Sequence, residues 1–347
     1  MTEKPLSTVA ASGSPASGAG AAPAPGAPLL QVEDLEVVLS TGSVTGRVID
    51  GVSFGVGAGR TTGLIGESGS GKTMSAMSIV RLLPDGAETS GRIVWRSQNL
   101  LDAPRRRIRE VRGREIGVIF QDPLAALNPI QPIGKQVGEI LRRGGMARQD
   151  VHARVLELLG RAGIPDPEQR VDVYPHELSG GLRQRVMIAM ALAGEPQLII
   201  ADEPTTALDV TTQARILRLL ADLRHQEGLA MLLVSHDLRV MAHVADEVVV
   251  MYAGRVAERG PAREVLERPR HPYTRALANN VPAVSTKTAI AEPLQGAPAN
   301  PFDRPSGCAF HPRCPLAVER CRTEKPELRE VEPGRFSACH RATEVAP

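Results

Sequence analysis

A glycine-rich segment between an apolar run and a helix-forming stretch is the strongest chemical signal in this sequence. The segment reads Gly66-Glu67-Ser68-Gly69-Ser70-Gly71-Lys72-Thr73 and follows the apolar run 61–65. Glycines leave room for backbone N–H groups around phosphate oxygens, and the N-terminus of the following helix (74–83) adds a positive dipole end. Lys72 can reach β- and γ-phosphates, and the Thr73 hydroxyl can ligate Mg²⁺. Because strand and helix flank the segment, a nucleoside triphosphate site is favoured over a chance glycine- and serine-rich turn.

Two carboxylates, Asp202 and Glu203, follow a second apolar run at 198–201. Open α/β sheets bind ligands at the carboxyl ends of their strands. There, Asp202 can hold Mg²⁺ through water, and Glu203 can take a proton from an attacking water, which contributes about 10²–10⁴-fold to a rate. The alternative is a pair of solvated acids at a strand end; the upstream phosphate loop favours the catalytic interpretation.

Two further polar residues end apolar runs. Gln121 follows 115–120 and can reach Mg²⁺ or water, while His236 follows 232–235 and can orient the γ-phosphate and the water. Taken alone, Gln121 is an ordinary turn residue and His236 is more often structural. Their positions in the series of strand ends place both in the predicted site.

A second cluster of small residues, Ser179-Gly180-Gly181, precedes the helical stretch 182–192. Such a helix start offers another set of backbone N–H groups to a phosphate, and in this chain it can bind the nucleotide of a facing subunit. An ordinary Ser-capped helix is the alternative.

The elements that must position these residues alternate between strands and helices. This order indicates an α/β fold with a parallel, doubly wound sheet around the phosphate loop. The strands 29–39, 48–54 and 91–95 predict an antiparallel layer beside it, and the spacing of apolar residues over 133–161 predicts a mainly α-helical insert, about 122–180. After Gly260 the character of the chain changes: a short helix is expected at 261–268, and 282–306 is rich in Pro and Ala. We therefore predict an Ala/Gly/Ser/Pro tail at 1–28, a nucleotide-binding domain at 29–260 and a C-terminal extension at 261–347.

Composition excludes several classes of protein. The chain has 347 residues, is 42% hydrophobic and carries a net charge of +2, so it can build a large core and has no strongly basic domain for nucleic acid. No apolar run approaches the roughly 18 residues that span a bilayer, and the N-terminus lacks the apolar segment of a signal peptide. Cytoplasmic residence is expected.

The basic stretch 105–114 is either a phosphate or lipid-headgroup patch or, as we favour, a solvated helix face.

Taken in order, these motifs resemble the ATP-binding subunit of an ATP-binding-cassette (ABC) transporter over residues 30–260. The motifs are GESGSGKT, Gln121, LSGGLRQR (178–185), LIIADE (198–203), the turn 206–209 and Ser235-His236-Asp237. The resemblance implies a P-loop (RecA-like) core with an antiparallel β subdomain and an α-helical subdomain. It further implies that Ser179, Gly180 and Gly181 complete the ATP site of a partner cassette, that Asp209 lies in the loop joining the two sites, and that Gln121 couples nucleotide to the membrane subunits.

The C-terminal extension narrows the resemblance. The segments 270–277 (RHPYTRAL) and 305–315 (PSGCAFHPRCP), with 120–129 (FQDPLAALNP), resemble the dipeptide, oligopeptide and nickel importer ATPases. The resemblance implies an ATPase with ATP and Mg²⁺ that powers peptide import. The implied partners are a second cassette that is a different chain, two transmembrane permease subunits and an extracytoplasmic solute-binding protein. The implied location is the cytoplasmic face of the inner membrane, as a peripheral subunit.

The sequence departs from the family in two places. Position 182 is Leu where many cassettes have Gln, a change common in this subfamily. No Tyr, Phe, Trp or His lies between Glu36 and Asp50, where the family usually offers an aromatic ring to adenine. Weaker base stacking follows, so we expect GTP to be tolerated, with a preference for ATP of less than about 100-fold, on the order of 2.7 kcal/mol.

The four cysteines, Cys308, Cys314, Cys321 and Cys339, all lie in the C-terminal extension. Their spacing lacks the paired short C-x₂₋₄-C of zinc ribbons, and disulfides are disfavoured without a secretion signal. The family resemblance implies a [4Fe–4S] cluster at matching cysteines, which suits looser spacing; zinc and free thiols remain the alternatives.

Other functions are weaker interpretations. A soluble cassette ATPase acting on ribosomes or DNA would normally show two cassettes or a long coiled-coil insert. A non-hydrolysing sensor would be expected to lack Glu203 or His236, and both are present. Nickel, glutathione and heme remain alternatives to peptides as the solute, because the solute-binding protein and permeases determine specificity.

Overall fold

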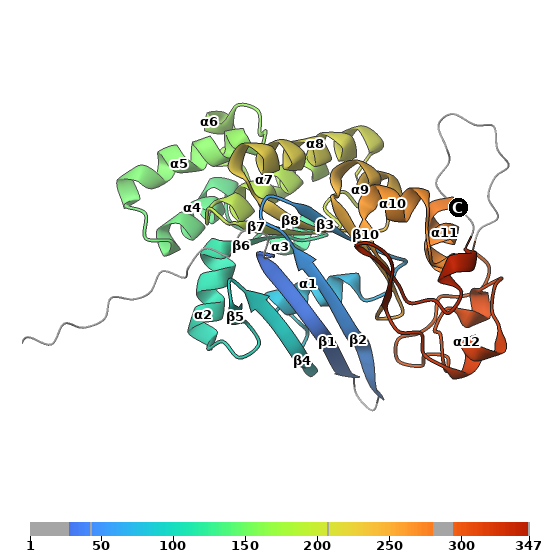
Figure 1. Cartoon of the computed structure of the whole chain (residues 1–347). Coiled ribbons are helices and arrows are strands. Elements are labelled where there is room, and N and C mark those ends of the chain that lie inside the picture. The colour runs from blue at the N-terminus through green and yellow to red at the C-terminus, as the bar shows by residue number, and fades with distance from the viewer. Residues whose placement is uncertain (1–27, 42–43, 207, 280–293, 346–347) are drawn as a thin grey trace, which may run out of the picture.

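The computed structural model describes residues 28–41, 44–206, 208–279 and 294–345. The predicted tail at 1–28 lies outside the described residues except for Pro28, as does Ala207 of the predicted turn 206–209. Two sheets organise the rest (Figure 1).

The first sheet is antiparallel and has four strands in the order β2-β1-β4-β5. Its strands are β1 (Leu30–Thr41), β2 (Val44–Val56), β4 (Ala87–Trp95) and β5 (Gln98–Asn99). Apolar residues alternate along β1 and β2 and bury one face of the sheet, as expected for an antiparallel layer with one face in the core. The predicted antiparallel layer is therefore confirmed, with longer strands than the sequence indicated.

The second sheet has eight strands in the order β11-β12-β10-β9-β3-β8-β7-β6. Five neighbouring strands run parallel: β9 (Glu247–Tyr252), β3 (Thr61–Ile65), β8 (Ala230–Ser235), β7 (Leu198–Asp202) and β6 (Ile116–Ile119). Every residue of β3, β7 and β8 is buried, because both faces of the sheet are covered. The predicted parallel α/β sheet is confirmed.

Helices cover both faces of this sheet. Helix α1 (Lys72–Ile79) packs between it and the antiparallel sheet, so that Ile79 and the apolar residues of both sheets form one core. Helices α8 (Val210–Glu227) and α9 (Leu238–Val244) lie on the opposite face and form a second core with residues such as Ile199 and Leu233. Strand β3, at the centre of the sheet, thus ends between two packed layers.

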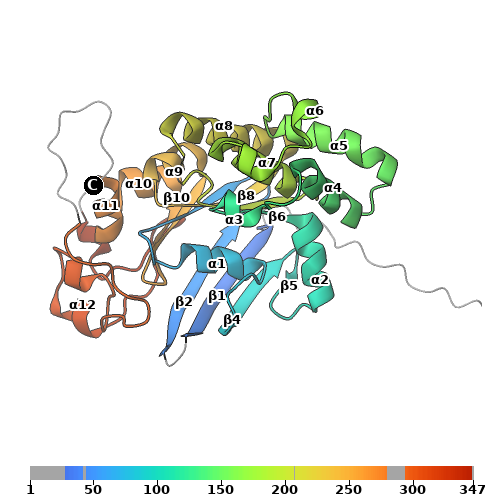
Figure 2. The same cartoon turned by 180° about the vertical axis from the view of Figure 1, so that it is seen from behind.

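The helical insert projects to one side of the sheets and the C-terminal extension to the other (Figures 1 and 2). The insert contains α3 (Pro123–Ala126), α4 (Ile133–Arg143), α5 (Arg148–Arg161), α6 (Pro167–Arg170) and the 3₁₀ turn Pro175–Glu177, and α7 (Gly180–Leu192) follows it. The basic stretch 105–114 forms α2 (Arg105–Glu110) and a π-helical turn (Val111–Glu115). Arg107 pairs with Glu115 and Arg112 donates to the Val80 carbonyl, so part of the stretch is tied to the fold.

The C-terminal extension joins the eight-stranded sheet. Strand β10 (Arg255–Pro261) pairs with β12 (Arg335–Ser337), which pairs with β11 (Arg329–Glu332). The fully buried side chains of Arg335 and Glu258 form an ion pair at 3.1 Å, and Glu258 also accepts the backbone N–H of Arg270 and His271. Since breaking a buried pair leaves an uncompensated charge, this contact fixes the extension on the sheet.

The remaining elements of the extension are short. They are α10 (Ala262–Glu267), α11 (Pro272–Asn279), the 3₁₀ turn His311–Arg313, α12 (Glu319–Thr323) and the 3₁₀ turn Ala342–Glu344. Within the described ranges, every helix is too short or too polar to cross a bilayer.

Candidate functional site

The glycine-rich loop connects β3 to α1 and can be built only with glycine at its two ends. Gly66 and Gly71 have φ of 153° and 99°. A Cβ on Gly66 would lie 2.3 Å from the Met251 carbonyl oxygen, and one on Gly71 would lie 2.5 Å from Cδ1 of Ile49. The loop therefore follows a path on which side chains are excluded, which leaves its backbone open to a ligand.

Lys72, the first residue of α1, lies across this loop. Its Nζ donates to the carbonyl oxygens of Gly66 (2.8 Å) and Glu67 (3.0 Å), and its side chain is 5% exposed. Burial lowers the pKa of Lys72, although Glu203 and Asp202 oppose that shift. A buried ammonium next to the loop backbone is placed to contact phosphate oxygens.

Thr73 and Asp202 meet although 129 positions separate them in the sequence. The Thr73 hydroxyl donates to Asp202 Oδ1 at 2.9 Å, and Asp202 is buried at the end of β7. Burial raises the pKa of the Asp202 carboxyl, and the nearby Glu203 raises it further, while the Thr73 hydrogen bond and Lys72 lower it. A hydroxyl and a carboxylate side by side are the hard oxygen donors that suit Mg²⁺.

Glu203 contacts the other predicted strand-end residues. Its carboxylate lies 3.3 Å from His236 Nδ1, accepts a hydrogen bond from Gln121 Nε2 at 3.2 Å and one from the Thr206 hydroxyl at 2.9 Å. Lys72 Nζ is 4.0 Å away. Glu203 also has a φ of 43°, a backbone conformation that side-chain-bearing residues seldom adopt and that often marks a functional position. The residues predicted from four separate segments therefore meet at one edge of the sheet.

The Ser179 turn lies apart from this group. Ser179 caps α7 and accepts the Leu182 N–H at 3.4 Å, and both Ser179 and Gly180 are exposed. A Cβ on Gly181 would lie 2.7 Å from Thr212 at the start of α8. Asp209, also exposed, caps α8 by accepting the Thr212 N–H at 3.0 Å, a contact that lowers the pKa of Asp209. Ser179, Gly180, Gly181 and Asp209 are absent from the lining of the cavity described next.

The phosphate loop opens into a cavity of about 860 Å³. Its polar end is lined by loop residues with Lys72, Thr73, Gln121, Glu203 and His236. Its other end is lined by apolar side chains, among them Leu39 and Val48 of the antiparallel sheet and Pro301 and Phe302 of the C-terminal extension. A volume of this size, with polar and apolar ends, suits a nucleotide.

The structure adds two residues to which the sequence assigned no role. The Glu67 carboxylate in the phosphate loop forms two hydrogen bonds with the Arg313 guanidinium, at 2.7 and 3.0 Å, and the Glu67 N–H donates to the Tyr273 hydroxyl at 2.8 Å. Tyr273 and Arg313 lie in the segments 270–277 and 305–315 that carried the resemblance. The sequence thus identified both segments as family motifs, but it did not indicate that they contact the phosphate loop.

The four cysteines gather around one small pocket without forming a metal-binding group. They line it together with Phe310 and His271, and all four are free thiols. Burial, helped by the charges of the neighbouring cysteines, raises the pKa of both Cys308 and Cys339 to about 11. Across the described residues, no three His, Cys, Asp or Glu side chains are placed to hold a metal ion. The [4Fe–4S] or zinc site at these thiols therefore stays a prediction.

Comparisons with known proteins cover most of the chain. A family model described as ABC transporter matches residues 49–206, and one described as the C-terminal region of oligopeptide/dipeptide transporters matches residues 257–321. The dipeptide transport ATP-binding protein DppD of Escherichia coli is 43% identical over 90% of this chain and 96% of its own length. The oligopeptide transport ATP-binding protein OppD of Salmonella typhimurium is 42% identical over 93% of this chain and 96% of its own length.

Solved structures match the cassette part of the fold. A dimeric ATP-binding cassette in a post-hydrolysis state with ADP and phosphate is 27% identical, with a TM-score of 0.60 over 67% of this chain and 99% of the other. The cbiO1 subunit of a Clostridium perfringens ABC transporter complex is 29% identical, with a TM-score of 0.60 over 69% of this chain and 91% of the other. The predicted P-loop core with its antiparallel β and α-helical subdomains is therefore confirmed.

Proposed function

Because the chain belongs to the ATP-binding subunits of ABC transporters, in the dipeptide and oligopeptide branch, we propose that it hydrolyses ATP to power the import of di- and oligopeptides. The observation on which this function rests most is the contact of Glu203 with Gln121, His236 and Lys72 at the open edge of the phosphate loop. These residues come from distant segments, and together they supply the base, the cation and the orienting groups that phosphoryl transfer to water needs.

The loop residues have distinct roles in this proposal. The backbone N–H groups of 66–73 surround the phosphates, and the Lys72 ammonium contacts the β- and γ-phosphates. Thr73, Asp202 and Gln121 are the residues that would hold Mg²⁺, which, when bound, neutralises the charge that develops on the phosphates. Support for this assignment comes from the 2.9 Å contact of the Thr73 hydroxyl with the buried Asp202 carboxylate.

Glu203 acts as the general base toward water. Its hydrogen bonds from Gln121 and Thr206 fix the carboxylate, and His236 is placed to orient the water and the γ-phosphate. The side chain of His236 is 59% exposed, so it can reach a ligand in the cavity. A positioned base is worth about 10²–10⁴-fold in rate.

A second cassette completes the site. Ser179, Gly180 and Gly181 are proposed to bind the nucleotide of the facing subunit, and Asp209 to lie between the two sites. Their absence from this chain's own cavity, together with the exposure of Ser179, Gly180 and Asp209, supports an intermolecular role. The facing cassette is proposed to be a different chain of the same family.

The remaining partners are two transmembrane permease subunits and an extracytoplasmic solute-binding protein. The chain would then lie at the cytoplasmic face of the inner membrane. We propose di- or oligopeptides as the solute, since the relatives DppD and OppD are dipeptide and oligopeptide transport ATP-binding proteins.

We also propose the division into a tail (1–28), a cassette (29–260) and an extension (261–347), with a helical insert at about 122–180. The boundary near 260 coincides with the end of β10.

A [4Fe–4S] cluster at the four cysteines stays a proposal, supported by their gathering around one pocket. It predicts broad absorbance near 400 nm in protein purified without oxygen, lost in Cys314→Ser; colourless, iron-free protein would rule the cluster out.

The function is tested with Glu203→Gln, which keeps the size of the side chain but removes the base. We expect ATP binding to be retained and turnover to fall by about 10²–10⁴-fold in the assembly with its companion chains. The matched control is Glu247→Gln, since Glu247 is 54% exposed and its nearest cation, Arg60, is 3.8 Å away. Unchanged turnover in Glu203→Gln would remove Glu203 from the mechanism, and absence of ATP turnover in the unaltered assembly would overturn the proposed function.

A further inference from the structure

The apolar end of the nucleotide cavity contains an aromatic ring that does not come from the antiparallel sheet. Between Glu36 and Asp50 the sequence has no aromatic residue, and the cavity wall there is formed by Leu39 and Val48. Phe302 of the C-terminal extension also lines the cavity, and the residue is 38% exposed. A phenyl ring thus stands 263 positions after Leu39 in the chain and beside it in space.

The ring lies directly on the backbone of the β1–β2 hairpin. A Cβ placed on Gly46 would lie 2.5 Å from Phe302 Cδ1 and 3.1 Å from its Cα. Any side chain at position 46 would therefore displace the ring. Because Gly46 has no side chain, the Phe302 ring packs closely against the backbone there, which joins the antiparallel sheet to the extension.

A tight turn presents the ring. The Phe302 N–H donates to Asn300 Oδ1 at 2.9 Å, and the Asp303 N–H donates to the Asn300 carbonyl at 3.1 Å. The Asn300 side chain thus replaces a backbone group in the turn, as Asn commonly does. This local bonding fixes the backbone of Phe302.

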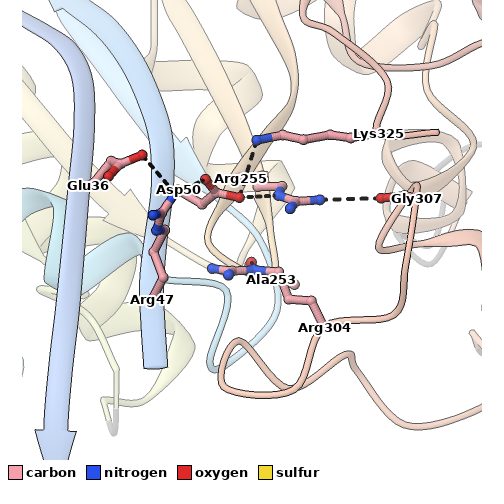
Figure 3. Close-up of polar contacts among 8 residues, drawn as sticks. All are labelled: Glu36, Arg47, Asp50, Ala253, Arg255, Arg304, Gly307 and Lys325. Carbon is pink, nitrogen blue, oxygen red and sulfur yellow. Dashed lines mark hydrogen bonds and ion pairs between the residues drawn. The ribbon is translucent and has the colours of Figure 1, made fainter. Parts of the chain in front are cut away.

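Both ends of the turn are bonded to the hairpin of β9 and β10. The Ala299 N–H donates to the Tyr252 hydroxyl at 3.1 Å, and Arg304 Nε donates to the Ala253 carbonyl at 2.5 Å (Figure 3). Further along, Asp50 of β2 accepts hydrogen bonds from Arg255 at 2.6 Å and from Lys325 of the extension at 3.2 Å. The turn that carries Phe302 is therefore bonded at both ends to the β9–β10 hairpin.

We propose that Phe302 stacks on the purine base of the nucleotide whose phosphates lie at Lys72, so that the extension supplies the aromatic contact that the antiparallel sheet lacks. The inference rests on the proposed ATP site and assigns its base-binding residue. On this side of the cavity, the described lining residues Leu39, Val48 and Phe302 are all apolar, which suits contact with the face of a heterocyclic base. Stacking of a base on an aromatic side chain corresponds to about a 5- to 150-fold gain in affinity.

Stacking on Phe302 is compatible with the GTP binding that the sequence predicts. A phenyl face offers no hydrogen-bond donor or acceptor, so it contacts adenine and guanine alike. Loss of the ring is then expected to weaken ATP and GTP binding by the same factor, within about threefold.

The test is equilibrium binding of Mg-ATP, Mg-GTP and inorganic tripolyphosphate to the purified full chain and to Phe302→Ala, Phe302→Leu and Phe302→Tyr. Tripolyphosphate has the phosphates but no base. We expect Phe302→Ala to lose about 5- to 150-fold in affinity for both nucleotides with unchanged affinity for tripolyphosphate, Phe302→Leu to behave like Phe302→Ala, and Phe302→Tyr to retain nucleotide affinity. Phe336→Ala, a change of another aromatic residue of the extension whose ring packs under Arg259 outside this cavity, is the control and should bind all three as the unaltered chain does.

Three outcomes would overturn the inference. They are unchanged nucleotide affinity in Phe302→Ala, equal losses for nucleotides and tripolyphosphate, which would indicate general distortion, and full affinity in Phe302→Leu, which would indicate bulk without stacking. Failure of the unaltered chain to bind ATP at all would instead overturn the proposed function, so the two failures are distinguishable.

Discussion

The ion pair between Glu67 and Arg313 predicts that the C-terminal extension stabilises the phosphate loop. Glu67 is the second residue of the loop, and Arg313 lies 246 positions later. The Arg313 side chain is 5% exposed and that of Glu67 is 24% exposed. The pair raises the pKa of Arg313, so its guanidinium is always charged. Replacing Arg313 by Ala would leave the loop carboxylate without its cation.

The magnitude follows from this geometry. Removing one partner of a fully buried pair costs about 3–5 kcal/mol, and a hydrogen bond to a charged group contributes about 1.5–3 kcal/mol. Because Glu67 can regain water over a quarter of its surface, we expect Arg313→Ala to lower the free energy of unfolding by about 2–3 kcal/mol. Without the ion pair, ATP must order one more residue of the loop when it binds, and the conformational entropy lost in doing so costs about 1–2 kcal/mol. The Kd for ATP then rises by about 5- to 30-fold.

Urea titration and equilibrium ATP binding measure the two effects, and a double-mutant cycle with Glu67→Gln isolates the pair. The cycle is needed because Arg313 also donates to the Gln295 carbonyl at 3.1 Å. We expect a coupling energy of at least about 1 kcal/mol. Arg320→Ala is the matched control in the same extension: its pair with Glu324 is 62% and 57% exposed, and its loss should cost less than about 0.5 kcal/mol. Coupling near zero, with ATP affinity unchanged in Arg313→Ala, would refute the reasoning.

Two further predictions concern Asp50 and Ser179. Burial alone would raise the pKa of Asp50, but the hydrogen bonds and charges of Arg255 and Lys325 outweigh it and hold that pKa well below its usual value. A carboxyl whose pKa is lowered on folding stabilises the fold at pH values above its unfolded pKa of about 3.9. In urea titrations, the free energy of unfolding of the unaltered chain should therefore exceed that of Asp50→Asn by about 2 kcal/mol at pH 7, and this difference should shrink as the pH falls from about 5 toward 2. A difference that does not change with pH would contradict this. Ser179→Arg should bind ATP normally as a single chain, since Ser179 lies outside the cavity, but should lose about 10²-fold in turnover of the assembled transporter; normal turnover would exclude the intermolecular role.

The sequence by itself determined the phosphate loop, the two acids at the end of β7 and the order of the elements around them. Each of these is a local pattern: eight residues with glycines at Gly66 and Gly71, an apolar run that ends in Asp202 and Glu203, and a Ser179 cap before a helix. Local patterns predict well because the backbone geometry they require is set within one turn or one strand. The convergence of Gln121 and His236 on Glu203 also followed from the sequence, since parallel strands end at one edge of a sheet.

Only the tertiary structure decided what the C-terminal extension does at the nucleotide cavity. Tyr273 and Arg313 were within recognised motifs, yet nothing in the sequence indicated that they contact Glu67, which lies 206 and 246 positions earlier. Phe302 gave no signal at all, because a single aromatic residue in a Pro-rich segment fits no local pattern. The absence of an aromatic residue between Glu36 and Asp50 was correctly read from the sequence, whereas the ring that lies there comes from 263 positions beyond Leu39. Contacts between segments so far apart depend on how the whole chain packs, and no spacing along the sequence encodes them.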